Sequence, residues 1–220
     1  MEPKTLDHVA FWVNNRHRIA EFAERHLGMH AIVTEENFTL LGSDARRGKL
    51  TLFDAEGPRA PGPFKHVALR VADLSAARAE LPEGTPDVFD IGDGVNVTLV
   101  EAPTDVDYDL DHVALWSASP AETAEEYARY GFEPAGRERV EVGGAYVELH
   151  QGSVEQAERP LLNHLAVLVD SADEVIADAA DLAIEVESVV DAANTYAAFL
   201  VGPDGVRIEY VEHKPTFSLT

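Results

Sequence analysis

The sequence predicts an α+β fold built from repeated strand and helix modules, and two observations support this. The first is a phrase that occurs four times, as LDHVAFW at 6–12, FKHVALR at 64–70, LDHVALW at 110–116 and LNHLAVL at 162–168. The second is that each phrase is followed by a stretch with helical spacing and then by shorter strand-like runs between turn residues. Repetition of this kind indicates supersecondary modules that pack on one another.

The repeated phrase alternates between two faces, as a strand requires. In the third copy, Val113 and Leu115 point one way while His112 points the other. The aliphatic face suits packing against helices, and the opposite face carries one histidine in every copy. These histidines are His8, His66, His112 and His164.

Four modules in 220 residues suit two paired halves better than one core. We expect an N-terminal pair at 1–103, made of modules 1–57 and 62–103, which lacks a metal. We expect a C-terminal pair at 108–220, made of modules 108–152 and 160–213, which carries one. The Gly/Pro-rich stretch 57–63 separates the first two modules, and the acidic segment 104–109 is expected to link the halves.

The first two modules differ in strand number. In module one, a strand at 6–13 precedes a helix with Ile19, Phe22 and Leu27 on one face, and Gly28 is placed to end it. Three strands are expected to follow, at 29–34, 37–42 and 49–54. Module two has a strand at 64–71 and a helix at 73–81, but only two further strands, at 86–91 and 95–101.

Modules three and four follow the full β-α-β-β-β plan. Ser119 and Pro120 supply an N-cap and a first helical residue, and Gly131 ends the third helix. Strands are expected at 133–135, 137–142 and 145–150. In module four we expect a strand at 162–169, a helix at 172–183 and strands at 184–189, 195–201 and 206–212.

The composition is that of a folded, strongly acidic protein. Asp and Glu number 40 against 17 Lys and Arg, which gives a formal net charge of −23. That charge argues against nucleic-acid or membrane partners, and the absence of cysteine removes disulfides and thiolate metal ligands. No apolar run approaches the ~20 residues of a membrane span, and no signal sequence is recognised, so the expected location is the cytoplasm.

When the last strands of the four modules are aligned, one position carries a carboxylate in modules three and four and a threonine in modules one and two. The corresponding residues are Thr51, Thr98, Glu148 and Glu209. Glu209 can share a face with His164, and Glu148 shares a face with Tyr146 and His150. Oxygen and nitrogen donors of this kind suit Fe(II), Mn(II), Ni(II), Co(II) or Zn(II), and two histidines with one carboxylate leave positions free for substrate.

We therefore predict a metal site in the C-terminal half, with His112, His164 and Glu209 as ligands. Glu148 is a further candidate ligand, although solvated glutamates at strand ends are common. His150 and Tyr146 are candidate acid–base or supporting groups. The last strands of the modules that contain His8 and His66 carry Thr51 and Thr98 in place of a glutamate. We therefore expect His8 and His66 to be packed, hydrogen-bonded side chains without a metal. They are then relics of duplication.

The chain resembles the vicinal oxygen chelate superfamily, which includes glyoxalase I, bleomycin-resistance proteins, methylmalonyl-CoA epimerases and type I extradiol dioxygenases. The resemblance rests on the four HVA-type strands, the module plan and the ending GPDGVRIEY at 202–210. It implies paired modules that form incomplete barrels around one divalent metal ion per chain. The ligands of extradiol enzymes map to His112, His164 and Glu209, and their N-terminal pair is catalytically silent.

The leading functional hypothesis is an extradiol-like dioxygenase that cleaves a catecholic substrate with O₂. Fe(II) or Mn(II) is then the favoured metal, and His150 or Tyr146 the group that transfers a proton. Phe199 departs from this pattern, because the resemblance places a tyrosine ahead of the final turn.

Two alternatives stay open. One is a lyase or isomerase of the glyoxalase I or epimerase kind, with Ni(II), Co(II) or Zn(II) held by His112, Glu148, His164 and Glu209. The other is a drug-resistance type of binding protein that does not transform its ligand. In each case the expected partner is a small molecule. If chains associate, we expect a homodimer.

Overall fold

Strands alternate with short helices along the part of the chain that the computed structural model describes, residues 1–154 and 157–220. The first half contains β1 (Thr5–Val13), α1 (Arg16–His26), β2 (His30–Thr34), β3 (Phe38–Gly42), β4 (Lys49–Asp54), β5 (Phe64–Val71), α2 (Leu74–Ala79), β6 (Val88–Asp90) and β7 (Asn96–Glu101). The second half contains β8 (Asp109–Ser117), α3 (Pro120–Tyr127), β9 (Glu133–Pro134), β10 (Arg139–Val142), β11 (Ala145–Gln151), β12 (Leu162–Leu168), α4 (Ala172–Asp181), β13 (Val186–Asp191), β14 (Thr195–Val201) and β15 (Arg207–His213). Single 3₁₀ turns at Ala128–Tyr130 and Pro203–Gly205 complete the described elements.

The predicted α+β fold class is confirmed by this order of elements. Strands β4, β5 and β14 begin and end at the predicted residues, and two strands follow the helix of the second module, as expected. The second helix is shorter than predicted. Its last backbone bonds, from Glu80 to Ala77 and from Leu81 to Arg78, have the tighter i to i−3 spacing, and Pro82 follows.

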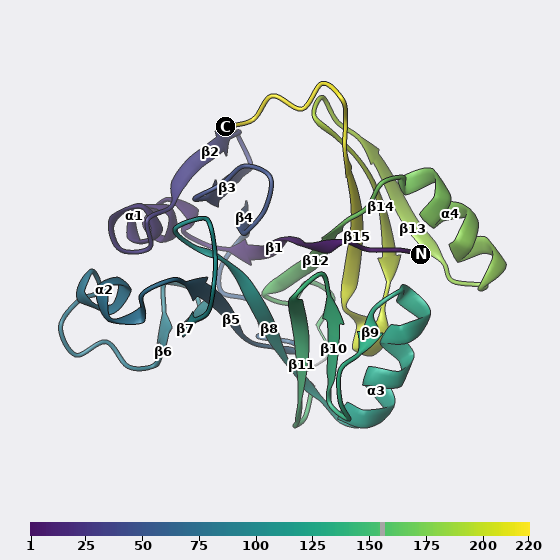
Figure 1. Ribbon diagram of the computed structural model, residues 1–220, viewed down its shortest axis with the longest axis horizontal. Coiled ribbons are helices and arrows are strands. Elements are labelled where there is room, and N and C mark those ends of the chain that lie inside the picture. The colour runs from purple at the N-terminus through teal and green to yellow at the C-terminus, as the bar shows by residue number, and fades with distance from the viewer. Residues whose placement is uncertain (155–156) are drawn as a thin grey trace.

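Two mixed sheets hold these strands (Figure 1). The eight-stranded sheet has the order β13-β14-β15-β12-β1-β4-β3-β2, and the seven-stranded sheet has the order β6-β7-β5-β8-β11-β10-β9. Strand β1 lies antiparallel to β12 at the centre of the first sheet, and β5 lies antiparallel to β8 at the centre of the second.

The predicted pairing of modules one with two and three with four is wrong for these sheets. The eight-stranded sheet unites the first and last modules, and the seven-stranded sheet unites the middle two. The reason lies in the connections. Because β7 runs parallel to β5, the short segment 102–108 turns the chain back and places β8 beside β5. The acidic segment 104–109 therefore joins strands of one sheet, and the chain changes sheet between Asp54 and Phe64 and again between Gln151 and Leu162.

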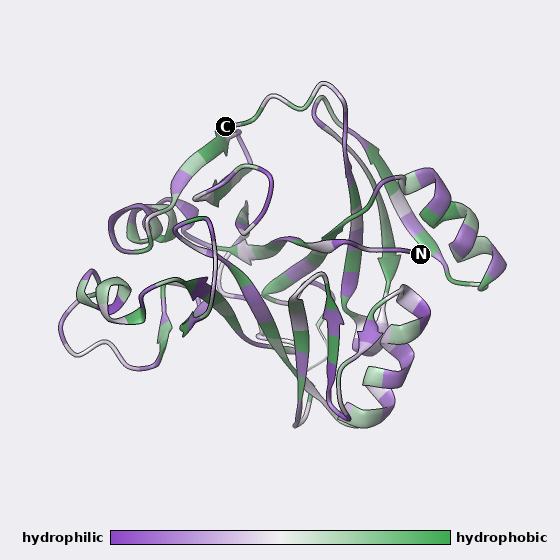
Figure 2. Ribbon diagram, viewed as in Figure 1, coloured by the Kyte–Doolittle hydropathy of each residue, from purple (hydrophilic) through white to green (hydrophobic). Residues whose placement is uncertain are grey.

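The two faces of the eight-stranded sheet have different roles. Val9 and Phe11 of β1 belong to the same buried core as Ile19 of α1 and Val175 of α4, and hydrophobic residues alternate with hydrophilic ones around α4, as an amphipathic helix requires (Figure 2). Residues of opposite parity form a separate apolar cluster, made of Ala166, Ala197, Phe199 and Val211. One face is therefore covered by helices, and the other is left for a site.

A buried ion pair ties β1 to its parallel neighbour β4. Lys49 Nζ lies 2.9 Å from Asp7 Oδ1 and 3.0 Å from Oδ2, and it also donates to the carbonyl oxygen of Ala45 at 2.9 Å. Burial raises the pKa of Asp7, but the charge of Lys49 and contacts with His213 and His8 outweigh it and hold the pKa well below its usual range. Asp7 is therefore a buried anion that depends on its partners.

Replacing Lys49 with methionine is expected to lower the free energy of unfolding by about 3–5 kcal/mol, because it leaves a buried carboxylate without its cation. Urea denaturation measures the change. Lys4→Met is the matched control: Lys4 pairs with Asp170 at the exposed surface, so its loss should change stability by about 0–1 kcal/mol. Equal, small effects of both substitutions would contradict the role assigned to Lys49.

Candidate functional site

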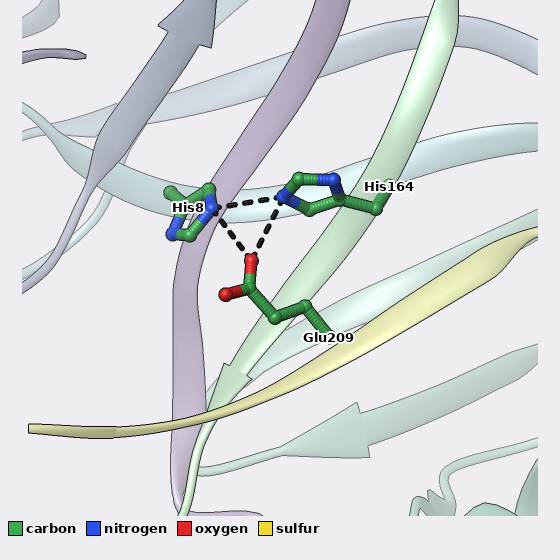
Figure 3. A group of neighbouring side chains, drawn as sticks. All are labelled: His8, His164 and Glu209. Carbon is green, nitrogen blue, oxygen red and sulfur yellow. Dashed lines mark hydrogen bonds and ion pairs between the residues drawn. The ribbon is translucent and has the colours of Figure 1, made fainter. Parts of the chain in front are cut away.

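Three side chains converge on the open face of the eight-stranded sheet: His8 from β1, His164 from β12 and Glu209 from β15 (Figure 3). We call them the triad. The Nε2 atoms of the two histidines lie 3.0 Å apart. Glu209 Oε2 lies 3.1 Å from His8 Nε2 and 2.9 Å from His164 Nε2. Both His164 and Glu209 are buried, and His8 is half-buried.

The strand register explains why these three residues meet. Ala166 of β12 is flanked by His8 on the antiparallel neighbour β1 and by Glu209 on the parallel neighbour β15. His164 precedes Ala166 by two residues, so its side chain points to the same face. Thr51 of β4 pairs with Ala10 as Glu209 pairs with Ala166, and it occupies the corresponding place on the other side of the site.

The triad is electrostatically coupled. Burial lowers the pKa of His8, but the negative charges of Glu209 and Asp7 outweigh it and raise that pKa to about 9. Burial lowers the pKa of His164 despite the same glutamate. Burial raises the pKa of Glu209, yet the two histidines hold it well below its usual range. The carboxylate of Glu209 is therefore ionised, and its negative charge favours a cation between the three side chains.

Neighbouring residues fix the orientation of both imidazole rings. Asp7 Oδ1 lies 2.7 Å from His8 Nδ1, and His213 Nε2 lies 3.0 Å from the other oxygen of the same carboxylate. Asn163 Oδ1 accepts from His164 Nδ1 at 3.0 Å and from Arg207 Nη1 at 3.1 Å. With Nδ1 engaged in each ring, both Nε2 atoms are directed at the carboxylate.

The donor set fits a divalent transition metal. Ligands bound at about 2.1 Å and at right angles to one another lie about 3 Å apart, and the three separations in the triad are 2.9, 3.0 and 3.1 Å. Two imidazoles and one carboxylate are ligands that Fe(II), Mn(II), Co(II), Ni(II) and Zn(II) accept. The triad therefore matches one face of a coordination sphere and leaves the opposite face free.

Aromatic side chains surround the triad. The ring centroid of His164 lies 5.2 Å from that of Phe199 and 6.3 Å from that of Phe53, and Trp12 lies 5.3 Å from Phe53. A cavity of about 400 Å³ is lined by Trp12 and by Asn163 and Arg207, among others. Its lining residue Asn163 accepts a hydrogen bond from His164, so one side chain connects this cavity with the triad. The volume lies in the range of small-molecule sites.

Comparisons with known proteins agree with this architecture. Residues 5–107 match the sequence model of the Glyoxalase/Bleomycin resistance protein/Dioxygenase superfamily. This part of the chain is therefore similar to members of that superfamily. The resemblance predicted from the repeated strands is therefore confirmed.

Solved structures extend the likeness in fold over nearly the whole chain. A "putative dioxygenase" from Bacillus subtilis has a TM-score of 0.80 at 15% identity, covering 98% of this chain and 87% of that one. Glyoxalase I from Zea mays has a TM-score of 0.68 at 16% identity, covering 94% and 92%. The cppA protein from Streptococcus pneumoniae has a TM-score of 0.62 at 13% identity, covering 96% and 98%. No curated protein sequence matches significantly. Among the described helices, none has the length and apolar character needed to cross a bilayer.

The structure divides the predicted ligands between the two sheets. It brings His164 and Glu209 together, as predicted, but the third member is His8 and not His112. His112 lies on β8 of the seven-stranded sheet, with its Nε2 3.3 Å from that of His66. The physical reason is the module pairing, since β12 has β1 as its neighbour and β8 has β5.

The predicted acid–base groups also lie on the seven-stranded sheet. Tyr146 stacks on His112 with ring centroids 4.5 Å apart, and His150 Nε2 lies 2.8 Å from Glu148 Oε2. The four-ligand set of His112, Glu148, His164 and Glu209 is therefore not assembled, and neither His150 nor Tyr146 is placed to act at the triad.

Sequence reasoning missed His8, Asp7 and His213. A signal was present in the residue before each histidine, which is Asp7, Lys65, Asp111 and Asn163 in the four copies. In the structure, three of these side chains, all but that of Lys65, contact Nδ1 of the histidine that follows. The Asp-His pair at the start of module one thus marked His8 as a histidine whose ring is held in a fixed orientation.

Replacing His8 with alanine is expected to weaken metal binding by the triad as severely as His164→Ala does. Each change removes a direct ligand, so the loss should exceed the roughly 100-fold that removal of an outer partner can cause. Competition with a chromogenic chelator for Co(II) measures it. His17→Ala, which removes an exposed imidazole from α1, should change nothing. Wild-type affinity in His8→Ala would exclude His8 as a ligand.

Asn163 tests the orientation of the second ring. Asn163→Ala removes the acceptor of His164 Nδ1 and should lower metal affinity by about 10–100-fold. Asn163→Asp keeps an acceptor at the same place and should retain affinity close to that of the wild type. The same chelator competition compares the two variants. If both bound alike, the contact with Asn163 would not orient His164.

Proposed function

We propose that this chain is a mononuclear divalent-metal dioxygenase that cleaves a catecholic substrate with O₂, with His8, His164 and Glu209 as its metal ligands. The triad carries the proposal. Two imidazoles and one carboxylate on one face of a coordination sphere, with open positions opposite, are typical of non-haem Fe(II) oxygenases. Thr51 occupies the place where a second glutamate would supply a fourth ligand, and this supports the open arrangement.

The proposed chemistry divides between the metal and the chain. When bound, the metal supplies a Lewis acid that can be chelated by two neighbouring substrate oxygens. Asp7 and Asn163 hold the imidazole rings so that their Nε2 atoms face the centre. Glu209 contributes the negative charge that offsets part of the charge of a divalent ion. Fe(II) is our first choice of metal and Mn(II) our second.

Packing around the triad favours a flat, aromatic substrate. Phe53 and Phe199 lie close to His164, and Trp12 packs on Phe53. Aromatic pairs gain from offset or edge-to-face contact beyond the burial of area. The apolar patch of Ala166, Ala197 and Val211 beside Phe199 excludes water from the same face. A catechol has both properties that this site requires, a planar ring and adjacent oxygens.

The test is O₂ consumption by the Fe(II)-loaded protein with a panel of catechols. We expect uptake with at least one member of the panel, one O₂ per catechol consumed. His164→Ala and Glu209→Ala should each lower the rate by more than about 100-fold, since loss of a ligand removes the metal that the chemistry needs. His17→Ala is the matched control and should retain the rate.

Iron bound at the triad without O₂ uptake on any catechol would refute the dioxygenase proposal. The same metal-loaded protein should then be assayed for isomerisation of a hemithioacetal. Turnover there would support the lyase or isomerase alternative. Binding of the small molecule without turnover in either assay would support the binding-protein alternative.

A further inference from the structure

The seven-stranded sheet repeats the strand arrangement that forms the triad. Strand β5 lies antiparallel to β8, and β8 lies parallel to β11. Ala114 of β8 is flanked by His66 on one neighbour and by Glu148 on the other. Ala166 is flanked in the same way by His8 and Glu209. The backbone therefore brings two histidines and one glutamate together a second time.

The two histidine pairs have nearly the same geometry. His66 and His112 have Nε2 atoms 3.3 Å apart and ring centroids 5.4 Å apart at 72°. The corresponding values for His8 and His164 are 3.0 Å, 5.2 Å and 75°. A separation of about 3 Å between nitrogens suits two imidazoles bound to one metal ion.

Outer contacts are repeated as well. Asp111 Oδ1 lies 2.8 Å from His112 Nδ1, and Arg70 donates from Nε to the other oxygen of that carboxylate at 3.0 Å. Asp7 is likewise shared between His8 and the cation of Lys49. An acidic partner on Nδ1 fixes the ring and leaves the Nε2 lone pair for a metal.

Glu148 is the point of difference between the two sheets. Its Oε2 lies 2.8 Å from His150 Nε2, and its side chain is 39% exposed, whereas that of Glu209 is 10% exposed. A cavity of about 380 Å³ is lined by Glu148, His150 and Arg139, among others. The carboxylate of Glu148 therefore has room to rotate, and an ion has a route to it from solvent.

We propose that His66, His112 and Glu148 form a second divalent-metal site, so that one chain binds two metal ions. Glu148 leaves His150 and turns to the histidine pair when the ion binds. This site is weaker than the triad for two reasons. The contact between Glu148 and His150 must break, and the cationic Lys65 adjoins His66 in the chain. The inference does not depend on the reaction proposed for the triad.

Titration with Co(II), followed by its visible absorption and by elemental analysis after desalting, tests the proposal. We expect two ions per wild-type chain. His164→Ala and His112→Ala should each bind one, and the double variant should bind none with comparable affinity. Glu148→Gln should lower the affinity of the weaker site at least about 10-fold and leave the tighter one unchanged. Thermal unfolding of each variant checks that it is folded.

His17→Ala and His26→Ala are matched controls, because both remove histidines of helix α1 that lie outside the two clusters. One ion per wild-type chain, with no change in His112→Ala, would overturn the second site. Two ions of which one is lost only in the control variants would also overturn it. If instead the triad binds no ion while His164→Ala still binds one, the second site stands and the function proposed for the triad fails.

Discussion

The antiparallel pairing of β1 with β12 is the constraint on which the functional face depends. Across this pair, two copies of one strand phrase run in opposite directions, and Ala10 pairs with His164 while His8 pairs with Ala166. Each histidine thus has a small alanine opposite it, which leaves room for the two rings to meet between the strands. On its outer side each of these strands has a parallel neighbour. The neighbour of β12 supplies Glu209, the third member of the triad, and the neighbour of β1 supplies Thr51 at the corresponding place.

Buried charge on this face is balanced in two layers. In the inner layer, the carboxylate of Glu209 is balanced by the imidazole of His8, whose pKa is raised. In the outer layer, Asp7 is balanced by Lys49. Isolated buried charges are strongly unfavourable. Because Lys49 neutralises Asp7, the carboxylate of Asp7 can contact His8 Nδ1 without adding an unpaired buried charge. A metal ion would replace the proton of His8 and leave the outer layer intact.

Local structure was predictable from the sequence, but the partnership of the ligands was not. Alternation, turn residues and helix caps are local signals, and they located β4, β5 and β14 to the residue. Which strand lies beside which is decided by contacts between segments far apart in the chain. His112 and His164 sit in copies of one phrase, so their sequences do not tell which of them pairs with His8. The presence of Thr51 in module one also suggested that His8 had no role, because the glutamate that serves His8 comes from module four.

The pairing of outer with outer and inner with inner modules makes the triad a product of the whole fold. His8 and His164 are 156 residues apart in sequence, and neither half of the chain contains all three side chains of the triad. Contacts of such sequence separation form late and slowly in folding, because the entropy of closing a long loop opposes them. The ligands are then scattered in the unfolded chain, and a metal ion that binds them stabilises the native state alone. The His66–His112 contact spans only 46 residues, so closing its loop costs less conformational entropy than closing the loop between His8 and His164.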